Sequence, residues 1–230
     1  MTNPAPSAPL LFISGLAREA AIARAPDGLA ICGGGAFLGA KLAATAPFRL
    51  AISFGLCGGL DPALRSGDVV IGARVLCGGA GVVADERVAR ELAARLAAAG
   101  ERVSLGAVVG VDAPVLTGAA KAELRRATMA AAVDMESGVA ARFAADRGAP
   151  FAVLRVVSDP ADRDLPPLVM KAVRSDGSVD LGAVVAGAMR SPAQIPGLIA
   201  AARDSAAAFA ALRRCRRIPG LFLGLGLAHL

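Results

Sequence analysis

Two short segments carry carboxylates directly behind apolar runs. Residues 133–137 spell Val-Asp-Met-Glu-Ser, and residues 155–162, a helix length further on, spell Arg-Val-Val-Ser-Asp-Pro-Ala-Asp. Parallel strands would deliver both segments to the edge of an α/β sheet, where ligands bind. An ionised carboxylate accepts several hydrogen bonds at once, which suits a ribose diol, and a second carboxyl can protonate a departing purine. The two segments therefore predict chemistry at a sugar–base bond.

Composition excludes several other kinds of site. The chain has 230 residues, 55% of them apolar, which is enough for a substantial core. Its cysteines, Cys32, Cys57, Cys77 and Cys215, lack ligand spacing and are expected to be free thiols, and the single histidine is His229. We therefore expect no metal and no histidine-based triad. The net charge is +6, but only 3% of residues are aromatic, so a nucleic-acid partner is not expected.

Short apolar runs alternate with alanine-rich helical patterns, which is typical of βαβ units. Residues 85–99 repeat apolar side chains at Val88, Leu92 and Leu96 and end before Gly100, which predicts a helix with one buried stripe. Residues 138–147 predict another helix. We expect a single α/β domain in three layers, with helices flanking a mixed, mainly parallel central sheet. The expected strands are residues 10–14, 29–32, 50–54, 68–75, 103–111, 131–134 and 151–157.

Glycines cluster at several predicted strand ends: residues 33–35, a predicted turn at 55–59, and residues 78–79. Such glycines let backbone approach a ligand closely, although a tight turn explains them equally well. The first cluster does not fit the dinucleotide pattern, because Leu38 stands where the third glycine belongs and no acidic residue follows about 20 positions later. A nicotinamide cofactor is therefore not expected.

The order of the motifs is more specific than any single motif. Gly15-x-x-x-Glu19 is followed by Ser-Phe-Gly-Leu-Cys-Gly-Gly-Leu at 53–60, by Gly-Asp-Val-Val at 67–70 and then by the two carboxylate segments. From about residue 10 to residue 161 the chain resembles the purine nucleoside phosphorylase and nucleosidase superfamily. The extension at 158–167 and the basic tail look like the hopanoid-associated phosphorylase branch. That resemblance implies a nucleoside phosphorylase-like fold and release of adenine from adenosylhopane.

The resemblance assigns roles to the two carboxylate segments. It implies that Glu136 binds the ribose 2′ and 3′ hydroxyls and that Met135 packs under the ribose. It also implies that Asp159, oriented by Ser158, is the general acid at purine N7. Structural roles compete with these: Glu136 can cap the next helix, Asp159 can start an Asx turn, and Met135 can fill the core. The joint order of the motifs favours the functional interpretation of Glu136 and Asp159.

The nucleophile can be water or phosphate. Glu19 falls where the nucleosidase branch has the carboxylate that activates water, although a helix cap explains it about as well. Phosphorolysis requires cationic donors, and Arg18, Arg24 and Arg74 are candidates by proximity in the sequence. Leu56 stands where related nucleosidases place a small polar residue that helps to hold water. Both routes stay open, with inorganic phosphate as the candidate co-substrate and no other cofactor.

The purine pocket departs from the pattern of its relatives. The loop at 110–115 falls where relatives often place an aromatic ring, but here it offers only aliphatic residues and Pro114. We expect Val115 and the backbone at Gly58 to contact the substrate, and Phe54 or Phe151 to supply the ring from elsewhere. The preference for adenine is implied by the resemblance alone.

The two chain ends differ in character. Residues 1–9, rich in proline and small residues, predict a flexible lead-in that is no signal peptide. Residues 10–212 form the expected domain, and residues 213–230 form a tail with four arginines and an apolar end too short to span a bilayer. This tail can dip into an anionic membrane surface or fold back over the core. The first alternative places a cytoplasmic protein on the inner face of the membrane.

Two other functions stay open. One is a nucleosidase for soluble nucleosides of the methylthioadenosine or adenosylhomocysteine type. The other is a catalytically silent nucleoside-binding protein at a membrane. A protein that only binds needs no proton donor at N7, so Glu136 and Asp159 favour an enzyme. Related folds often complete their sites across subunits, which implies a homo-oligomer.

Overall fold

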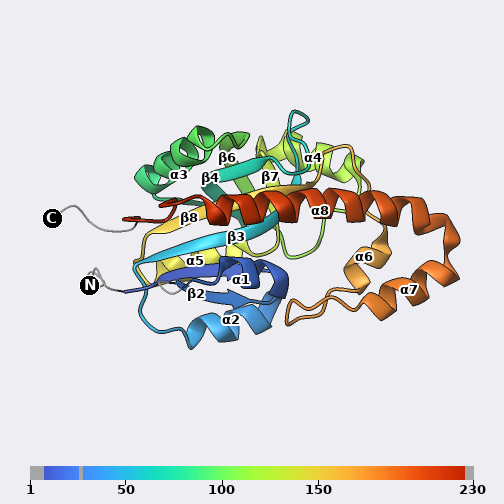
Figure 1. Ribbon diagram of the computed structural model, residues 1–230, viewed down its shortest axis with the longest axis horizontal. Helices are drawn as coiled ribbons and strands as arrows, with labels where there is room; N and C mark the ends of the chain where they lie inside the picture. Colours follow the sequence, from blue (N-terminus) through green and yellow to red (C-terminus); the bar gives the residue numbers. More distant parts are fainter. Residues whose placement is uncertain (1–7, 26–27, 226–230) are drawn as a thin grey trace.

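The computed structural model describes residues 8–25 and 28–225 (Figure 1). Within them, helices cover both faces of one eight-stranded mixed sheet. The strands are β1 (Leu10–Ser14), β2 (Gly28–Cys32), β3 (Leu50–Gly59), β4 (Val69–Cys77), β5 (Ala80–Val83), β6 (Val103–Gly110), β7 (Ala132–Asp134) and β8 (Phe151–Asp159). The helices are α1 (Ala17–Ala23), α2 (Gly35–Ala43), α3 (Glu86–Ala98), α4 (Gly118–Thr128), α5 (Ser137–Asp146), α6 (Pro167–Lys171), α7 (Leu181–Arg190), the 3-10 helix η1 (Pro192–Gln194) and α8 (Ile195–Arg217).

The sheet closes on itself around β3. Strands β2, β1 and β3 lie side by side in parallel, and pairing continues from β3 through β8, β4, β6 and β7. Strand β7 then returns to the far end of β3, where Val133 pairs with Gly58 and Ala132 with Gly59. Closure therefore brings Asp134, the last residue of β7, beside the glycine-rich end of β3.

Alternation along the strands builds two cores, one on each face of the sheet. Leu10 and Phe12 of β1 join a cluster covered by α3 and α8, and Leu11 and Ile13 join a cluster covered by α2 and α5. Figure 1 shows α8 lying across the first of these faces. Because both faces are covered by helices, the central strands are mostly apolar, as in other buried sheets, and the polar exceptions include Ser53 on β3 and Arg155 and Asp159 on β8.

The structure confirms the predicted fold class, and all seven predicted strands form. The predicted turn at 55–59 is wrong, because these residues extend β3 and pair with β8 and β7. Strand β5 was not predicted. Gly78 and Gly79 form its two-residue hairpin turn with β4, with φ of 59° and 80°, as such turns require. This turn explains the glycine pair at 78–79 without a ligand.

The C-terminal segment packs on the core as far as it is described. Helix α8 crosses the expected domain boundary at 212 without a break, and Leu212 and Cys215 are both fully buried. Beyond it, Leu221, Phe222 and Leu225 join the same core, and Phe222 packs edge-on against Phe12. The tail thus folds back over the core up to residue 225, the second of the two alternatives. Residues 226–230 lie outside the described part of the chain.

An arm projects from the other end of α8. Helices α6 and α7, η1 and the first half of α8 extend beyond the sheet (Figure 1). Residues 192–217 are long and apolar enough to cross a membrane by length and composition alone. The second half of this helix belongs to the core, with Ala208, Phe209 and Ala211 buried. We therefore treat α8 as part of the fold, with an exposed half and a buried half.

Candidate active site

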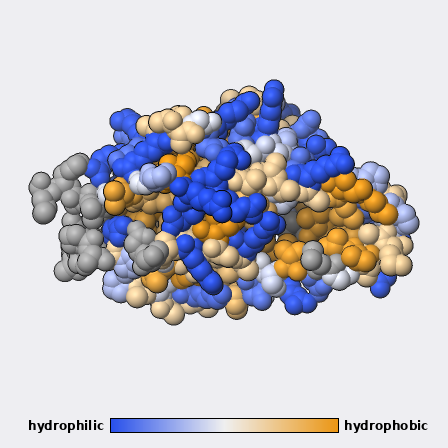
Figure 2. Space-filling model, viewed as in Figure 1, coloured by the Kyte–Doolittle hydropathy of each residue, from blue (hydrophilic) through white to orange (hydrophobic). Residues whose placement is uncertain are grey.

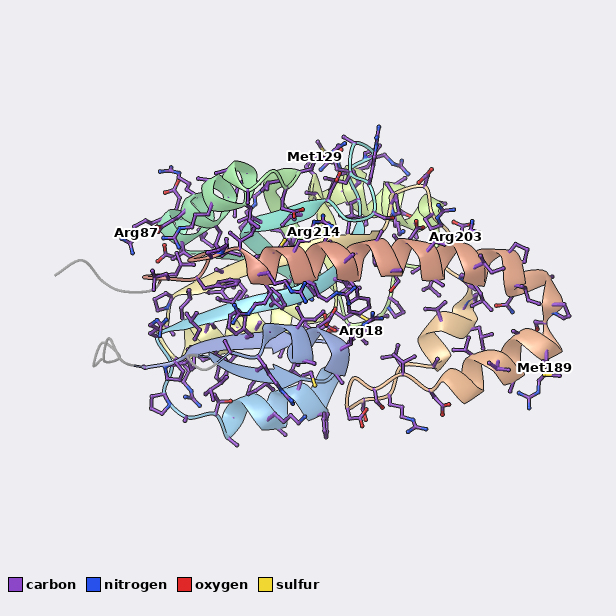
Figure 3. The ribbon with its side chains drawn as sticks, viewed as in Figure 1. Arg18, Arg87, Met129, Met189, Arg203 and Arg214 are labelled. Atoms are coloured by element: carbon purple, nitrogen blue, oxygen red, sulfur yellow. The ribbon has the colours of Figure 1, made fainter. Side chains whose placement is uncertain are left out.

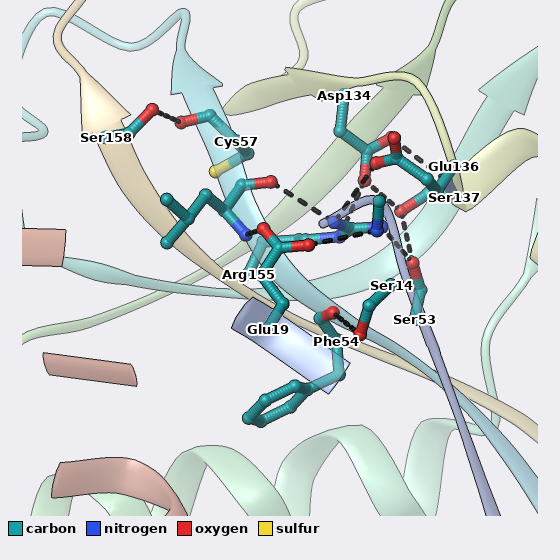
Figure 4. A network of polar contacts seen from close by, with 12 residues as sticks. Ser14, Glu19, Ser53, Phe54, Cys57, Asp134, Glu136, Ser137, Arg155 and Ser158 are labelled. Carbon is teal, nitrogen blue, oxygen red and sulfur yellow. Dashed lines mark hydrogen bonds and ion pairs between the residues drawn. The ribbon is translucent and has the colours of Figure 1, made fainter. Parts of the chain in front are cut away.

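A fully buried arginine lies at the centre of a polar network (Figure 4). Arg155 sits in the middle of β8, on the face turned toward α5. Its Nη2 donates to Ser53 Oγ at 2.6 Å, and its Nη1 donates to the Leu56 carbonyl at 3.2 Å. Its Nε lies 2.7 Å from Asp134 Oδ2, and its Nη1 lies 3.3 Å from Glu136 Oε2. One guanidinium therefore ties β3 and β8 to the segment between β7 and α5.

The Asp-Met-Glu segment places two carboxyls on this arginine for different reasons. Asp134 accepts the Ser137 backbone N–H at 3.1 Å and the Ser137 hydroxyl at 2.5 Å, so it caps the start of α5. Glu136 makes no cap hydrogen bond and instead reaches Arg155. The predicted alternative that Glu136 caps the next helix is therefore wrong, because Asp134 takes that place.

The Glu136 carboxyl is held in a close-fitting space. Burial raises its pKa from 4.5 to about 8, against the opposing effect of Arg155 and with help from the nearby Asp134 and Glu19 carboxyls. A Cβ on Gly15 would lie 2.4 Å from Glu136 Oε1, so a side chain there would displace the Glu136 carboxyl. Glycine at position 15 thus leaves room for Glu136.

Glu19 lies on the other side of the same cluster. Its Oε2 accepts the backbone N–H groups of Gly15 at 2.9 Å and Leu16 at 2.8 Å, and its Oε1 accepts that of Leu56 at 2.8 Å. It therefore caps α1 and also joins α1 to β3. Gly55 leaves room for it, since a Cβ there would lie 2.6 Å from the Glu19 carboxyl carbon. Burial raises the pKa of Glu19, against Arg155 and the three N–H donors.

Asp159 ends β8 and forms the second half of the site. Its Oδ1 accepts the Ser158 hydroxyl at 2.5 Å, as the predicted orienting role of Ser158 requires. Its Oδ2 lies 2.7 Å from the ammonium of Lys121, a residue of α4. Burial raises the pKa of Asp159, while Lys121 and Ser158 lower it. The carboxyl is thus held by two side chains, Ser158 and Lys121. Among the described residues it accepts no backbone N–H from the following turn, as an Asx turn would require.

Strand β3 sets the spacing between the two halves. Leu56 contacts Glu19 and Arg155, and two residues further a Cβ on Gly58 would lie 3.0 Å from Asp159 Oδ2. Two residues of extended strand span about 7 Å. The two halves of the site therefore lie along one strand, two residues apart on β3.

The other predicted site residues fall in different places. Met135 is half-buried next to Glu136. Val115 packs against a small third apolar cluster that includes Leu60 and Val133. Phe54 and Phe151 are buried in the two main cores, so the prediction that either stacks on a base is wrong. Strand alternation turns the Phe54 ring away from the network, as Figure 4 shows.

The three arginines proposed for phosphate are not brought together. Arg18 lies over the ring of Phe209 in α8, 4.1 Å from its centroid, and Figure 3 shows it between α1 and α8. Arg24 is exposed at the end of α1, and Arg74 is exposed in the β4–β5 hairpin.

The arginine that does lie at the site, Arg155, was not among the predicted site residues. Its signal was a charged residue inside the apolar run Phe-Ala-Val-Leu-Arg-Val-Val, since a buried charge requires partners. No group of His, Cys, Asp and Glu that could hold a metal occurs in the described residues.

A model of the phosphorylase superfamily matches residues 29–190, more than half of the chain. The chain belongs to the phosphorylase superfamily. The matched range includes strands β3 to β8 of this chain. Gly15 and Glu19 lie before it. No curated protein matches the chain in sequence.

Solved structures of similar fold include several bacterial enzymes. The 5′-methylthioadenosine/S-adenosylhomocysteine nucleosidase of Neisseria meningitidis, in complex with methylthio-immucillin-A, has a TM-score of 0.62 and 18% identity, over 90% of this chain and 96% of that one. The nucleosidase of the same name from Helicobacter pylori has a TM-score of 0.60 and 14% identity, over 68% and 87%. Futalosine hydrolase of H. pylori has a TM-score of 0.59 and 15% identity, over 68% and 86%. At these identities the likeness establishes the shared fold.

Proposed function

We propose that the protein hydrolyses the N-glycosidic bond of a purine nucleoside and releases the free base. The observation that carries the proposal is the order along β3, with Glu19, Glu136 and Arg155 around Leu56 and Asp159 at Gly58. A nucleoside lying along this segment has its ribose hydroxyls at Glu136 and purine N7 at Asp159. Asp159 protonates the base as it leaves, and the ionised carboxylates beside Glu136 stabilise the positive charge that develops on the sugar.

The charges of the site favour water over phosphate as the nucleophile. The Asp134 and Glu19 carboxylates flank a single guanidinium, that of Arg155, and Glu136 adds no positive charge, so a phosphate dianion would meet excess negative charge. Phosphate-binding sites instead gather cations. Glu19 Oε1 accepts a single hydrogen bond from the protein, which leaves it free to accept one from an attacking water. Its raised pKa also makes it a stronger base than an exposed carboxylate. Phosphorolysis, with inorganic phosphate as co-substrate, is the competing route.

We further propose that the nucleoside carries a large apolar group, with adenosylhopane as the candidate. The support is the arm, whose exposed apolar residues include Val185, Met189 and Ile199 (Figures 2 and 3). Between α6, α7 and η1 the arm contains a pocket of about 350 Å³. The loop before α7 reaches back to the site, where Gly177 accepts the Ala17 backbone N–H at 2.9 Å. An apolar substituent on the sugar can therefore leave the site along the arm.

The same surface suggests where the protein works. We place it in the cytoplasm, peripheral to the inner face of the membrane, with the arm toward the lipid, because the described part of the tail is packed in the core. Since a hydrocarbon substituent stays in the bilayer, an exposed apolar surface next to the site gives the enzyme access to it. A homo-oligomer remains a prediction.

The test is base release from adenosylhopane in detergent and from methylthioadenosine, with and without phosphate, with the sugar product identified by mass. Hydrolysis predicts a free ribosyl product, independence from phosphate, and incorporation of oxygen from ¹⁸O-labelled water. A phosphoribosyl product formed only with phosphate would replace hydrolysis by phosphorolysis. Faster turnover of methylthioadenosine than of adenosylhopane would contradict the lipid-linked substrate.

Two variants connect this activity to the site. Asp159→Asn and Glu19→Gln should each lower kcat by about 10² to 10⁴, the usual contribution of a general acid or base. The matched control is Asp162→Asn, because Asp162 is an exposed carboxylate three residues after Asp159. Full activity in Asp159→Asn would refute its assignment as the proton donor.

A further inference from the structure

Lys121 is a buried cation that has no role in the reaction as proposed above. It lies in the second turn of α4, its side chain has no exposed surface, and its ammonium lies 2.7 Å from Asp159 Oδ2. The same ammonium donates to the Pro160 carbonyl at 2.9 Å and to the Arg163 carbonyl at 3.0 Å. It also lies 3.4 Å from the Asp159 carbonyl, so all three of its N–H donors have partners. Burying such a charge is costly unless it is fully paired, as it is here.

The turn after Asp159 has anchors that do not involve Lys121. Arg163 pairs with Asp204 of α8 at 2.8 Å, Asp164 accepts the Gly118 backbone N–H at 2.7 Å, and Leu165 donates its backbone N–H to Leu116 at 2.7 Å. Holding the turn therefore does not by itself call for a buried ammonium. The contact that distinguishes Lys121 is the one with the Asp159 carboxyl.

We propose that Lys121 is a positioning residue that acts through Asp159, as the counter-ion of the carboxylate formed when Asp159 gives its proton to the base. The inference rests on the proposed function. In the reaction, the Asp159 O–H bond breaks and its proton moves to purine N7, while the electron pair of the glycosidic bond passes to the base. The oxygen of the attacking water forms the new bond to the anomeric carbon, and the water gives its proton to Glu19. Asp159 is left as a carboxylate beside the Lys121 ammonium, which keeps its own protons. After product leaves, Glu19 releases its proton to solvent and Asp159 takes one up from solvent, which restores both groups.

This arrangement favours the transition state over the bound substrate. A neutral Asp159 carboxyl interacts weakly with an ammonium, and the interaction strengthens as negative charge develops on the oxygen. Lys121 is also the largest influence that lowers the Asp159 pKa against burial. The other charged or titratable groups around Asp159 are Asp204, which is paired with Arg163, and the Cys57 thiol of β3. Only Lys121 among these brings a positive charge to the carboxyl.

The test compares Lys121→Gln and Lys121→Arg with the wild type on two substrates. One is the adenine nucleoside, and the other is a nitrophenyl riboside, whose leaving group needs no proton. In Lys121→Gln we expect kcat for the adenine nucleoside to fall about 10- to 100-fold, the effect of losing a hydrogen bond to a charged group. The riboside rate should change much less, and the alkaline limb of the kcat–pH profile should move to higher pH. Lys121→Arg, which keeps the charge, should retain the position of that limb.

A purely structural role predicts a different result. If Lys121→Gln is folded and loses the same factor on both substrates, with the alkaline limb unmoved, the proposal is overturned. Unchanged kcat on the adenine nucleoside overturns it too. A second measurement needs no substrate: the Asp159 carboxyl is titrated by ¹³C NMR, with its signal assigned from Asp159→Asn. Its pKa should be higher in Lys121→Gln than in the wild type, and equal values would refute the coupling even if the protein proves to have another substrate.

Discussion

Glu136 should make the protein less stable as the pH rises. Burial raises the pKa of its carboxyl from 4.5 to about 8 in the folded protein. Between these two values the folded protein holds a proton that the unfolded chain has already released. The stabilisation is fully present below pH 4.5 and is lost as the pH rises through 8. Across this window the free energy of unfolding should fall by about 1.4 kcal/mol for each pH unit, because of Glu136 alone.

The measurement is urea unfolding of the wild type and of Glu136→Gln at pH 5.5, 6.5 and 7.5, at constant ionic strength. Gln has the size of the protonated side chain but does not titrate. Over these two pH units the wild type should therefore lose about 3 kcal/mol more than the variant. Glu123→Gln is the control, because Glu123 is exposed on α4 and should leave the pH dependence unchanged. Parallel curves for wild type and Glu136→Gln would refute the view that the cluster holds Glu136 in its protonated form.

Three further predictions concern the same network and its surroundings. Gly15→Ala should lower kcat/KM for the nucleoside at least about tenfold, since the new methyl would displace the Glu136 carboxyl and weaken its hydrogen bonds to the ribose. Gly39→Ala, in an open part of α2, is its control in the same kinetic assay and should retain full activity. Arg155→Met should lower the free energy of unfolding by about 3 to 5 kcal/mol at pH 7.5, because it removes the cation that pairs with the buried Asp134 and Glu19 carboxylates. The loss, measured by urea unfolding, should be smaller at pH 5.5, where protons neutralise them, and an equal loss at both pH values would contradict this explanation. At pH 8 a disulfide reagent should modify the half-buried Cys32 before Cys57 and Cys215, because burial raises the pKa of both thiols, to about 12 for Cys215. Peptide mass spectrometry identifies the modified thiol, and early labelling of Cys215 would refute that order.

Much of the fold could be predicted because its strands are short, apolar and bounded by glycine. The sequence also placed Glu136 and Asp159 just past apolar runs: Asp159 is the last residue of β8, and Glu136 follows the end of β7 by two residues and directly precedes α5. The glycines at 55–59 were predicted to form a turn because glycine marks turns more often than strands. Here glycine is needed inside β3, where Gly55 and Gly58 make room for the carboxyls of Glu19 and Asp159.

The partners of the carboxyls could not be predicted in the same way. Lys121 lies on an amphipathic helix, where a lysine is usually exposed, and only the folded chain brings it to Asp159 from 38 positions away. Phe54 was expected near the base because the loop at 110–115 offers no aromatic ring. It alternates with Ser53 on β3, so the serine faces the polar network and the ring faces the core. Counting positions along β3 from Leu50 would have identified this.

The single guanidinium shared by Glu19, Asp134 and Glu136 also restricts how this site can diverge. A lineage that loses Arg155 first passes through a chain with three uncompensated buried carboxyls, a step that selection for a folded protein removes. A lineage that first replaces one of the carboxyls by a neutral residue meets no such barrier. Descendants with altered chemistry are therefore expected to keep the arginine longest, so that in diverged members a retained arginine marks a former site after its acids have gone.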